Sequence, residues 1–298
     1  MIAPGGTNPP REVEVKIGFN MLLWTAFVTE EHFPVFSKLK STGYDGVEIP
    51  LFQGDAPHYA KVGRALKDAG LKCTAVTVMP DKAHNCISET VSDREGAAAH
   101  LKWAVDCCAA MGAEVLCGPF YQPLGVFSGK GPTEGEKERG AEVHRGIACY
   151  AQDAKVLLTV EPLNRFECYF LNTLKDAADY VRRVGHANFK GMYDTFHGNI
   201  EEKDPVGCIR DHSAVLGHFH VSASDRGTPG RDHVRWPETF RALRAGGYDA
   251  WLTIEAFGRA MPDLAATTCV WRDLSGSPEE VYVEGYKLIR GGWAAAWA

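Results

Sequence analysis

Four side chains of metal-ligand type lie at the ends of four successive apolar runs in the second half of the chain. Glu161 stops the run 156–160, and Asp194, His220 and Glu255 lie at or near the ends of the next three runs. Successive members of this set are 26 to 35 residues apart, close to the roughly 30 residues of one strand-plus-helix unit. The spacing therefore predicts that the four side chains meet at one end of four consecutive parallel strands.

The residue types predict a site for a divalent metal ion. Two glutamates, an aspartate and a histidine form an oxygen-rich set, which suits Mn²⁺, Mg²⁺ or Co²⁺ better than it suits a thiolate-preferring ion. Taken singly, a carboxylate after a strand is more often a helix cap or part of a loop ion pair. A buried charge, however, costs several kcal/mol unless it is paired or bound to a metal. Because side chains alternate along a strand, the register puts all four groups on equivalent faces and favours the metal.

The elements that must position this set alternate regularly along residues 13–298. Eight strands are expected at 13–20, a short run ending at 48–50, 72–78, 114–118, 156–160, 189–194, 215–221 and 250–255, with helices between them and a last helix over 278–289. This pattern predicts a single (β/α)8 TIM barrel, in which active sites lie at the carboxyl ends of the strands. An open α/β sheet of the dinucleotide-binding type would be expected to have a Gly-x-Gly-x-x-Gly turn after the first strand, and none is present. Residues 1–12, rich in Pro and Gly, are expected to form a disordered arm.

Composition excludes several classes of function. The chain has 298 residues, 45% of them hydrophobic, a net charge of −6 and no basic cluster, which disfavours nucleic-acid binding. It has no apolar run of 18 residues and no signal-peptide pattern, so no membrane association is expected. The nine cysteines include no Cys-x-x-Cys pair and suggest reduced thiols in a cytoplasmic protein, with a redox role for Cys107 and Cys108 left open.

Three further features have alternative interpretations. Glu48 could line the pocket or pair with a neighbouring lysine or arginine. The loop 119–132 is long for a barrel and could form a lid or a subunit contact. Trp24 and Phe257, and less clearly Tyr121, could form apolar walls of the pocket, although buried aromatic residues more often belong to the core.

The motifs around the candidate ligands resemble those of the D-tagatose 3-epimerase family, which includes D-psicose (D-allulose) and L-ribulose 3-epimerases within the xylose-isomerase-like barrels. The resemblance extends over nearly the whole chain after about residue 14. The matching segments are Val-Glu-Pro-Leu-Asn-Arg-Phe-Glu (160–167), Asp-Thr-Phe-His (194–197) followed by Asn-Ile-Glu-Glu (199–202), Gly-His-Phe-His (217–220) and Ile-Glu-Ala-Phe (254–257). The first two are fairly specific to the epimerases, and the other two also suit the wider superfamily.

The resemblance implies a role for each matching residue. One divalent ion, with Mn²⁺ the first choice and Co²⁺ or Mg²⁺ as alternatives, would be held by Glu161, Asp194, His220 and Glu255. Glu161 and Glu255 would also be the acid/base pair on opposite faces of the sugar. The substrate oxygens would be bound by Glu167, His197 and Arg226, although the stretch 224–227 departs from the family pattern just before the arginine. The resemblance further implies a homodimer or homotetramer that acts on a small-molecule ketose.

Inversion of C3 requires the same residue types, namely two bases, here carboxylates, and ligands for a divalent ion. A weakly acidic C–H proton beside a carbonyl must be removed and then returned from the other face, so two bases must flank the substrate. A divalent ion that bridges two adjacent substrate oxygens would stabilise the intermediate cis-enediolate. We therefore expect a metal-dependent 3-epimerase for free ketoses of the D-fructose/D-psicose, D-tagatose or L-ribulose type.

Other functions remain as alternatives to this prediction. The main one is an aldose–ketose isomerase of the sugar or hydroxypyruvate type on the same fold. The segment 164–167 and His197 favour the epimerase. A barrel that binds without turnover is disfavoured because both Glu161 and Glu255 are present, and a multi-zinc phosphodiesterase would need more histidines at strand ends.

Overall fold

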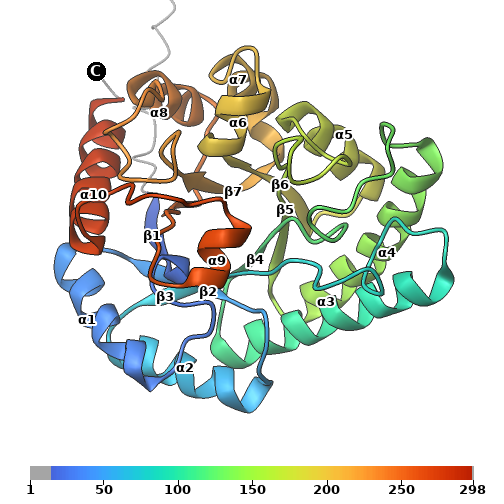
Figure 1. The fold of residues 1–298 in the computed structure, drawn as a ribbon, viewed down its shortest axis with the longest axis horizontal. Helices are drawn as coiled ribbons and strands as arrows, with labels where there is room; N and C mark the ends of the chain where they lie inside the picture. The colour runs from blue at the N-terminus through green and yellow to red at the C-terminus, as the bar shows by residue number, and fades with distance from the viewer. Residues whose placement is uncertain (1–14, 297–298) are drawn as a thin grey trace, which may run out of the picture.

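Eight parallel strands, arranged in the order of the sequence, close into a barrel in the computed structural model, which describes residues 15–296 (Figure 1). The strands are β1 Lys16–Asn20, β2 Gly46–Pro50, β3 Lys72–Val76, β4 Val115–Gly118, β5 Leu157–Val160, β6 Phe189–Asp194, β7 Leu216–Val221 and β8 Trp251–Ile254. β1 pairs with both β2 and β8, so the sheet has no free edge. The predicted (β/α)8 barrel is confirmed, whereas the predicted arm 1–12 lies outside the described residues.

Helices surround the barrel and connect its strands (Figure 1). The α-helices are α1 Phe33–Thr42, α2 Ala56–Asp68, α3 Val91–Met111, α4 Glu134–Asp153, α5 Leu174–Val184, α6 Thr195–Glu201, α7 Gly207–His212, α8 Trp236–Ala245, α9 Pro262–Thr267 and α10 Pro278–Ala295. Short 3₁₀ turns occur at η1 Met21–Leu23, η2 Glu30–His32 and η3 Ser213–Val215. No helix within residues 15–296 is both long and apolar enough to cross a membrane.

Local sequence signals account for several helix ends. Thr173 and Asp176 form a capping box at the start of α5, and Ser277 caps α10 by accepting a hydrogen bond from the backbone N–H of Glu280. α3 ends at Gly112, whose φ of 81° is a left-handed conformation that glycine adopts without a side-chain clash. These signals explain why the end of α3 and the starts of α5 and α10 lie at or within one residue of the predicted positions.

Two short helices and one helix end differ from the prediction. α6 begins directly after Asp194, which accepts a hydrogen bond from the backbone N–H of Phe196 and so caps the helix. α9 has a proline at its first turn but only six residues, too few for a periodic pattern. α10 runs to Ala295, beyond the predicted end at residue 289.

The interior of the barrel is more polar than its surroundings. Large apolar side chains such as Phe189, Phe219 and Phe240 are buried in the molecule, each contributing about 1.5–3 kcal/mol by burial. Polar residues on strands of the barrel are buried as well, among them Asn20, Glu48, Thr74, Thr159, His218 and Thr253. Barrel interiors are usually filled by branched apolar side chains. Glu48 accepts hydrogen bonds from Asn20 and Thr74 here, whereas Thr159 Oγ1, Thr253 Oγ1 and His218 Nδ1 have no hydrogen-bond partner in the described part of the chain.

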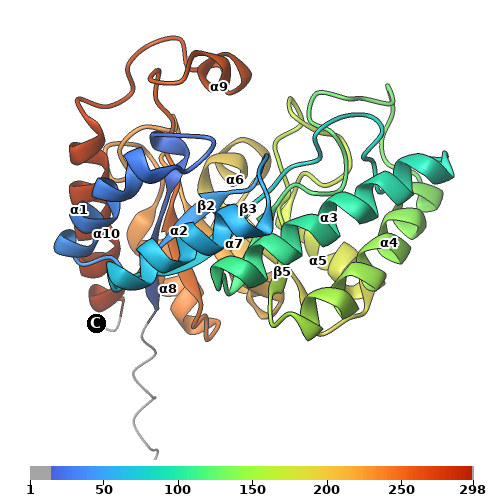
Figure 2. The same ribbon diagram turned by 90° about the horizontal axis from the view of Figure 1, so that it is seen from below.

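The mouth of the barrel lies at the carboxyl ends of the strands, where the predicted ligands are. Figure 2 shows α9, which follows β8, standing over this end of the molecule. The long loop after β4 and the segment after β5 lie side by side there, since the backbone N–H of Gly125 donates to the carbonyl of Glu167 at 2.9 Å. The fold therefore gathers the ends of four strands and several loops around one opening.

Candidate metal centre and active site

The four predicted metal ligands converge at the carboxyl end of the barrel. One ligand atom from each of Glu161, Asp194, His220 and Glu255 lies within 4.8 Å of the other three, and all four residues are buried. Glu161 and Glu255 directly follow β5 and β8, Asp194 ends β6, and His220 lies near the end of β7. The structure thus brings together the set that the sequence spacing singled out.

The geometry of His220 supports a cation in this cluster. Its Nδ1 lies 3.5 Å from Glu255 Oε2, 3.9 Å from Glu161 Oε1 and 4.0 Å from Asp194 Oδ2. This nitrogen is buried and has no hydrogen-bond partner. Donor atoms bound to one small divalent ion at about 2.1 Å lie roughly 3 to 4 Å apart. The cluster therefore fits a metal ion such as the one predicted, by spacing and by donor type.

Asp194 serves both the fold and the site. Its Oδ1 accepts a hydrogen bond from the Phe196 N–H at the start of α6 (2.7 Å), while its Oδ2 faces the cluster. The aspartate is therefore fixed by the helix cap, and its other oxygen faces the cluster, where it pairs with the guanidinium of Arg226 at 2.6 Å. The sequence indicates that a carboxylate at a strand end can be either a helix cap or a metal ligand. The two oxygens of Asp194 allow both roles.

The two glutamates differ in their tendency to carry a proton. Burial raises the pKa of Glu161 well above its usual value, and the nearby charges of Glu255 and Asp194 raise it further against the effect of His220. Burial would also raise the pKa of Glu255, but His220 and Arg226 outweigh it and hold that pKa below the usual value. Without a metal, the two shifts favour a proton on Glu161 and the ionised form of Glu255, an asymmetry that acid/base pairs often show.

Arg226 is the cationic side chain nearest to the carboxylates. Its Nη1 donates to Asp194 Oδ2 and to Glu255 Oε2, both at 2.6 Å. The guanidinium lies between the rings of Phe196 and Phe257, 4.0 and 4.8 Å from their centroids. The backbone at Arg226 is left-handed, with φ of 68°, a conformation that usually costs about 1–3 kcal/mol away from glycine. The strain is offset by a buried ion pair and two cation–π contacts.

His197 and Glu167 lie beside the cluster as predicted substrate-binding groups. Burial and the charge of Arg226 lower the pKa of His197 to about 3, so its ring is neutral. Its Nδ1 accepts a hydrogen bond from the Asn164 N–H at 3.1 Å, and its Nε2 lies 2.9 Å from Arg226 Nη2. Glu167 Oε1 accepts a hydrogen bond from Asn164 Nδ2 at 2.7 Å, and burial raises the pKa of Glu167.

The cluster opens into a cavity of about 180 Å³ with one polar side. Glu161, Glu167, His197, Arg226 and Glu255 form that side. The remaining wall is mainly apolar and includes Leu22, Phe52, Val76, Leu124, Phe257 and, from α9, Leu264. Such a cavity can bind a small molecule whose polar end faces the carboxylates.

Of the three aromatic residues considered for the pocket wall, only Phe257 lines this cavity. The structure does not bring Trp24 to it, because the indole packs against Phe19 and Tyr282 at centroid distances of 5.0 and 6.3 Å. Tyr121 is fully buried, with its hydroxyl 3.1 Å from Cys168 Sγ. Both side chains belong to the packing behind the pocket wall.

Several residues of the site had no clear signal in the sequence. Asn164 links His197 to Glu167, and Asn20 lies in contact with Glu255. Glu48, for which a pocket-lining role and an ion pair with lysine or arginine were both open, meets two histidines. Leu264, Thr267 and Thr268 reach the cavity from α9 and its end. Glu48 is singled out in the sequence by its position at a strand end, and Asn20, at the end of the first predicted strand, carries the same signal.

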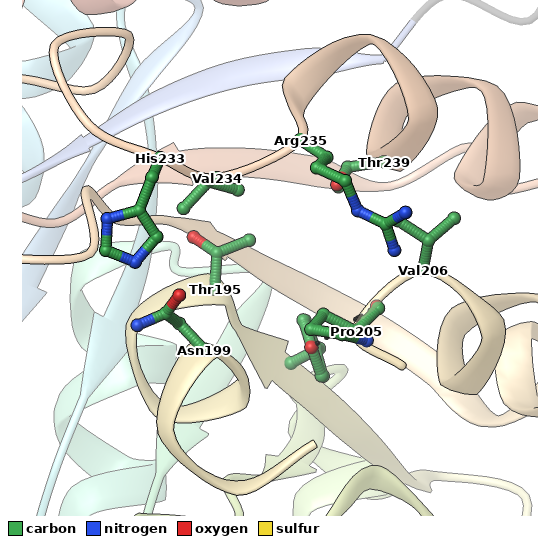
Figure 3. A pocket seen from close by; sticks show the side chains of 9 residues that line it. Thr195, Asn199, Pro205, Val206, His233, Val234, Arg235 and Thr239 are labelled. Atoms are coloured by element: carbon green, nitrogen blue, oxygen red, sulfur yellow. Dashed lines mark hydrogen bonds between the residues drawn. The ribbon is translucent and has the colours of Figure 1, made fainter. Parts of the chain in front are cut away.

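A second, smaller cavity of about 70 Å³ lies on the other side of α6 (Figure 3). Asn199 and Thr195 face His233 and Val234 across it. Thr195 Oγ1 is already engaged by the carbonyl and N–H of Ser222 at 2.6 and 2.9 Å, and no carboxylate is among the residues that line this cavity. The acid/base groups therefore belong to the larger cavity.

A family model, two sequence relatives and a crystal structure that resemble this chain agree with one another. A family model described as a xylose isomerase-like TIM barrel matches residues 36–291. The D-psicose 3-epimerase of Agrobacterium fabrum is 32% identical over 271 residues, 89% of this chain and 93% of that protein. The ketose 3-epimerase of Arthrobacter globiformis is 30% identical over 279 residues, 93% and 96% of the two chains. The crystal structure of D-psicose 3-epimerase with D-tagatose from Clostridium cellulolyticum H10 matches with a TM-score of 0.85 at 27% identity, covering 94% of this chain and 99% of that one.

Proposed function

The chain belongs to the ketose 3-epimerases within the xylose isomerase-like TIM barrels, and from this premise we propose that it inverts C3 of free ketoses in a metal-dependent reaction. It is thus a carbohydrate epimerase. The observation that carries the proposal is the convergence of four buried ligand atoms in which both acid/base candidates, Glu161 and Glu255, take part. A metal ion, proposed to be Mn²⁺, would supply Lewis-acid stabilisation of the negative charge that develops on the ketose oxygens.

Glu161 and Glu255 are the groups proposed to move the proton. They come from β5 and β8, which are separated in the barrel by β6 and β7, so their carboxylates approach the cavity from different directions. One carboxylate takes the proton from C3, and the other returns a proton to the opposite face of that carbon. Both carboxylates belong to the same candidate ion site, with ligand atoms within 4.8 Å of each other, which supports their acting on the same bound molecule.

Glu167, His197 and Arg226 are proposed to orient the substrate. All three line the polar side of the cavity beside the carboxylates. The neutral His197 ring and the guanidinium of Arg226 can hydrogen-bond to the oxygens around the reacting carbon, and Asn164 holds His197 and Glu167 in place. Holding the ketose in one orientation decides which carbon meets the two bases.

The remaining wall of the cavity supports a neutral sugar as the substrate. Beyond the polar side, the wall is mainly apolar, with Leu22, Phe52 and Leu264 among its residues. The only arginine or lysine that lines the cavity in the described chain is Arg226, and two carboxylates already pair with it. A phosphate group would therefore have to compete with Asp194 and Glu255 for this single guanidinium.

Purified protein tests the proposal with a panel of ketoses: D-fructose, D-psicose, D-tagatose, L-ribulose and the 6-phosphate ester of fructose. We expect 3-epimerisation of at least one free ketose and a much slower reaction of the ester. Chelation and dialysis should abolish the activity, since the carboxylates alone cannot stabilise the developing anion, and Mn²⁺ or Co²⁺ should restore it. Full activity in verified metal-free protein, or a strong preference for the ester, would contradict the proposal.

A further inference from the structure

Below the predicted metal ligands, the barrel interior contains a fully buried carboxylate, that of Glu48 on β2. Its Oε1 accepts a hydrogen bond from Asn20 Nδ2 at 2.9 Å and lies 2.7 Å from His220 Nε2. Its Oε2 accepts a hydrogen bond from Thr74 Oγ1 at 2.8 Å. A buried carboxylate costs several kcal/mol unless it is satisfied in this way. The residue therefore belongs to a specific network that crosses the barrel.

The two ring nitrogens of His220 have different surroundings. Nε2 faces Glu48 from below, whereas Nδ1 faces the oxygens of Glu161, Asp194 and Glu255 and has no hydrogen-bond partner. A histidine that binds a metal through Nδ1 must carry its proton on Nε2, and a carboxylate that accepts this proton fixes both the tautomer and the plane of the ring. Glu48 is placed to be that acceptor.

Asn20 extends the same network to a second predicted ligand. Its Nδ2 donates to Glu48 Oε1 and to Glu255 Oε1, both at 2.9 Å. One oxygen of Glu255 is thereby held by the amide, and the other faces His220 Nδ1 at 3.5 Å. Through one direct contact and one amide bridge, Glu48 orients two of the four ligand groups.

We propose that Glu48 is a positioning residue for the metal centre, which presents His220 Nδ1 and, through Asn20, Glu255 Oε2 to the ion. This inference rests on the metal-dependent function proposed above. The competing explanation is that Glu48 only neutralises His218, whose Nε2 lies 2.8 Å from Oε2. The two explanations differ in which oxygen of Glu48 is important, because His220 and Asn20 use Oε1 and His218 and Thr74 use Oε2.

Calorimetric titration of metal-free protein with Mn²⁺ tests the proposal apart from activity. Glu48→Gln keeps the shape of the side chain but removes its charge, and we expect it to weaken Mn²⁺ binding by about tenfold to a hundredfold. Thr74→Val is the matched control, because it removes a hydrogen bond to the other oxygen of the same carboxylate. It should leave Mn²⁺ affinity within about threefold.

The outcomes separate the two proposals. If the wild-type protein binds no Mn²⁺ or other divalent ion at this site, the proposed function fails. If it binds Mn²⁺ and Glu48→Gln binds equally tightly, or if Thr74→Val weakens binding as much as Glu48→Gln, the positioning role of Glu48 is wrong. Circular dichroism and thermal unfolding of each variant without metal identify a loss of affinity that comes from misfolding.

The tautomer of His220 provides a readout that does not depend on any variant folding. In wild-type protein loaded with diamagnetic Zn²⁺, ¹⁵N spectra should show the His220 proton on Nε2, protected from exchange by its hydrogen bond to Glu48. Binding of the ion should move the Nδ1 resonance and leave a protonated Nε2. A proton on Nδ1, with Nε2 unprotonated, would overturn the proposal.

Discussion

At the scale of single residues, burial and neighbouring charges set the protonation of the candidate ligands before a ligand enters the site. Burial raises the pKa of Glu161 well above its usual value, with Glu255 and Asp194 adding to the effect. Burial would lower the pKa of His220, but Glu48 and Glu255 raise it well above its usual value. Both shifts favour the protonated forms of Glu161 and His220 in metal-free protein, so a metal ion must compete with protons at these two ligands.

We expect the affinity for Mn²⁺ to increase with pH for this reason. Below the raised pKa values each displaced proton costs up to about tenfold in affinity per pH unit, and the dependence levels off above them. Calorimetry at about pH 6, 7 and 8, in buffers of different ionisation enthalpy, measures both the affinity and the number of protons released. An affinity that does not change over this range, with no proton release, would contradict the assigned protonation of Glu161 and His220.

At the scale of the elements, the strand ends must be held tightly for the ligands to meet. Gly118 ends β4 beside the site, with φ of 126°. A Cβ atom there would lie 2.2 Å from the carbonyl oxygen of Thr77, which is backbone and cannot move aside freely. The left-handed conformation and the close approach together require glycine at this strand end.

Gly118→Ala should accordingly lower the thermal unfolding temperature by several degrees, since strain and overlap of this kind each cost about 1–3 kcal/mol. Gly129→Ala is the matched control. Gly129 also has a positive φ, 78°, but a Cβ atom there would meet nothing within 4 Å. Gly129→Ala should therefore destabilise the protein less than Gly118→Ala, because only the backbone conformation is unfavourable for alanine there. Equal shifts for the two variants, measured by calorimetric scanning, would show that the close approach at Gly118 has no energetic consequence.

The elements also show how far the sequence can predict the structure. Glu161 was predictable because an apolar run, a carboxylate and a proline follow one another locally. Asp194 and Glu255 repeat the apolar run and the carboxylate, without the proline, at barrel spacing. The contact between Glu48 and His220 joins residues that are 172 positions apart across the barrel, and no local pattern marks it. The place of Trp24 stayed open between pocket wall and core because an aromatic residue after a strand can pack against either. α9 was missed because it has only six residues.

At the scale of the whole molecule, the barrel stacks chemically different layers along its axis. Glu48 contacts His218 and His220 in the buried interior, His220 joins the other three candidate ligands, and Arg226 and His197 border the cavity. α9 stands over the opening and contributes Leu264 to the wall (Figure 2). A small molecule in this cavity would have carboxylates from β5 and β8 on different sides and an apolar wall around its other end.

The central claim, that this arrangement inverts C3 of a ketose with two bases, is tested most directly by solvent isotope incorporation. The reaction is run in deuterium oxide with a ketose that the protein converts, and the position of the label is read by NMR. Because each carboxylate can exchange its proton with water between turnovers, the account predicts deuterium at C3 of the ketose and none at C1. Deuterium at C1 with an unlabelled C3 would contradict it and assign the protein to aldose–ketose isomerisation.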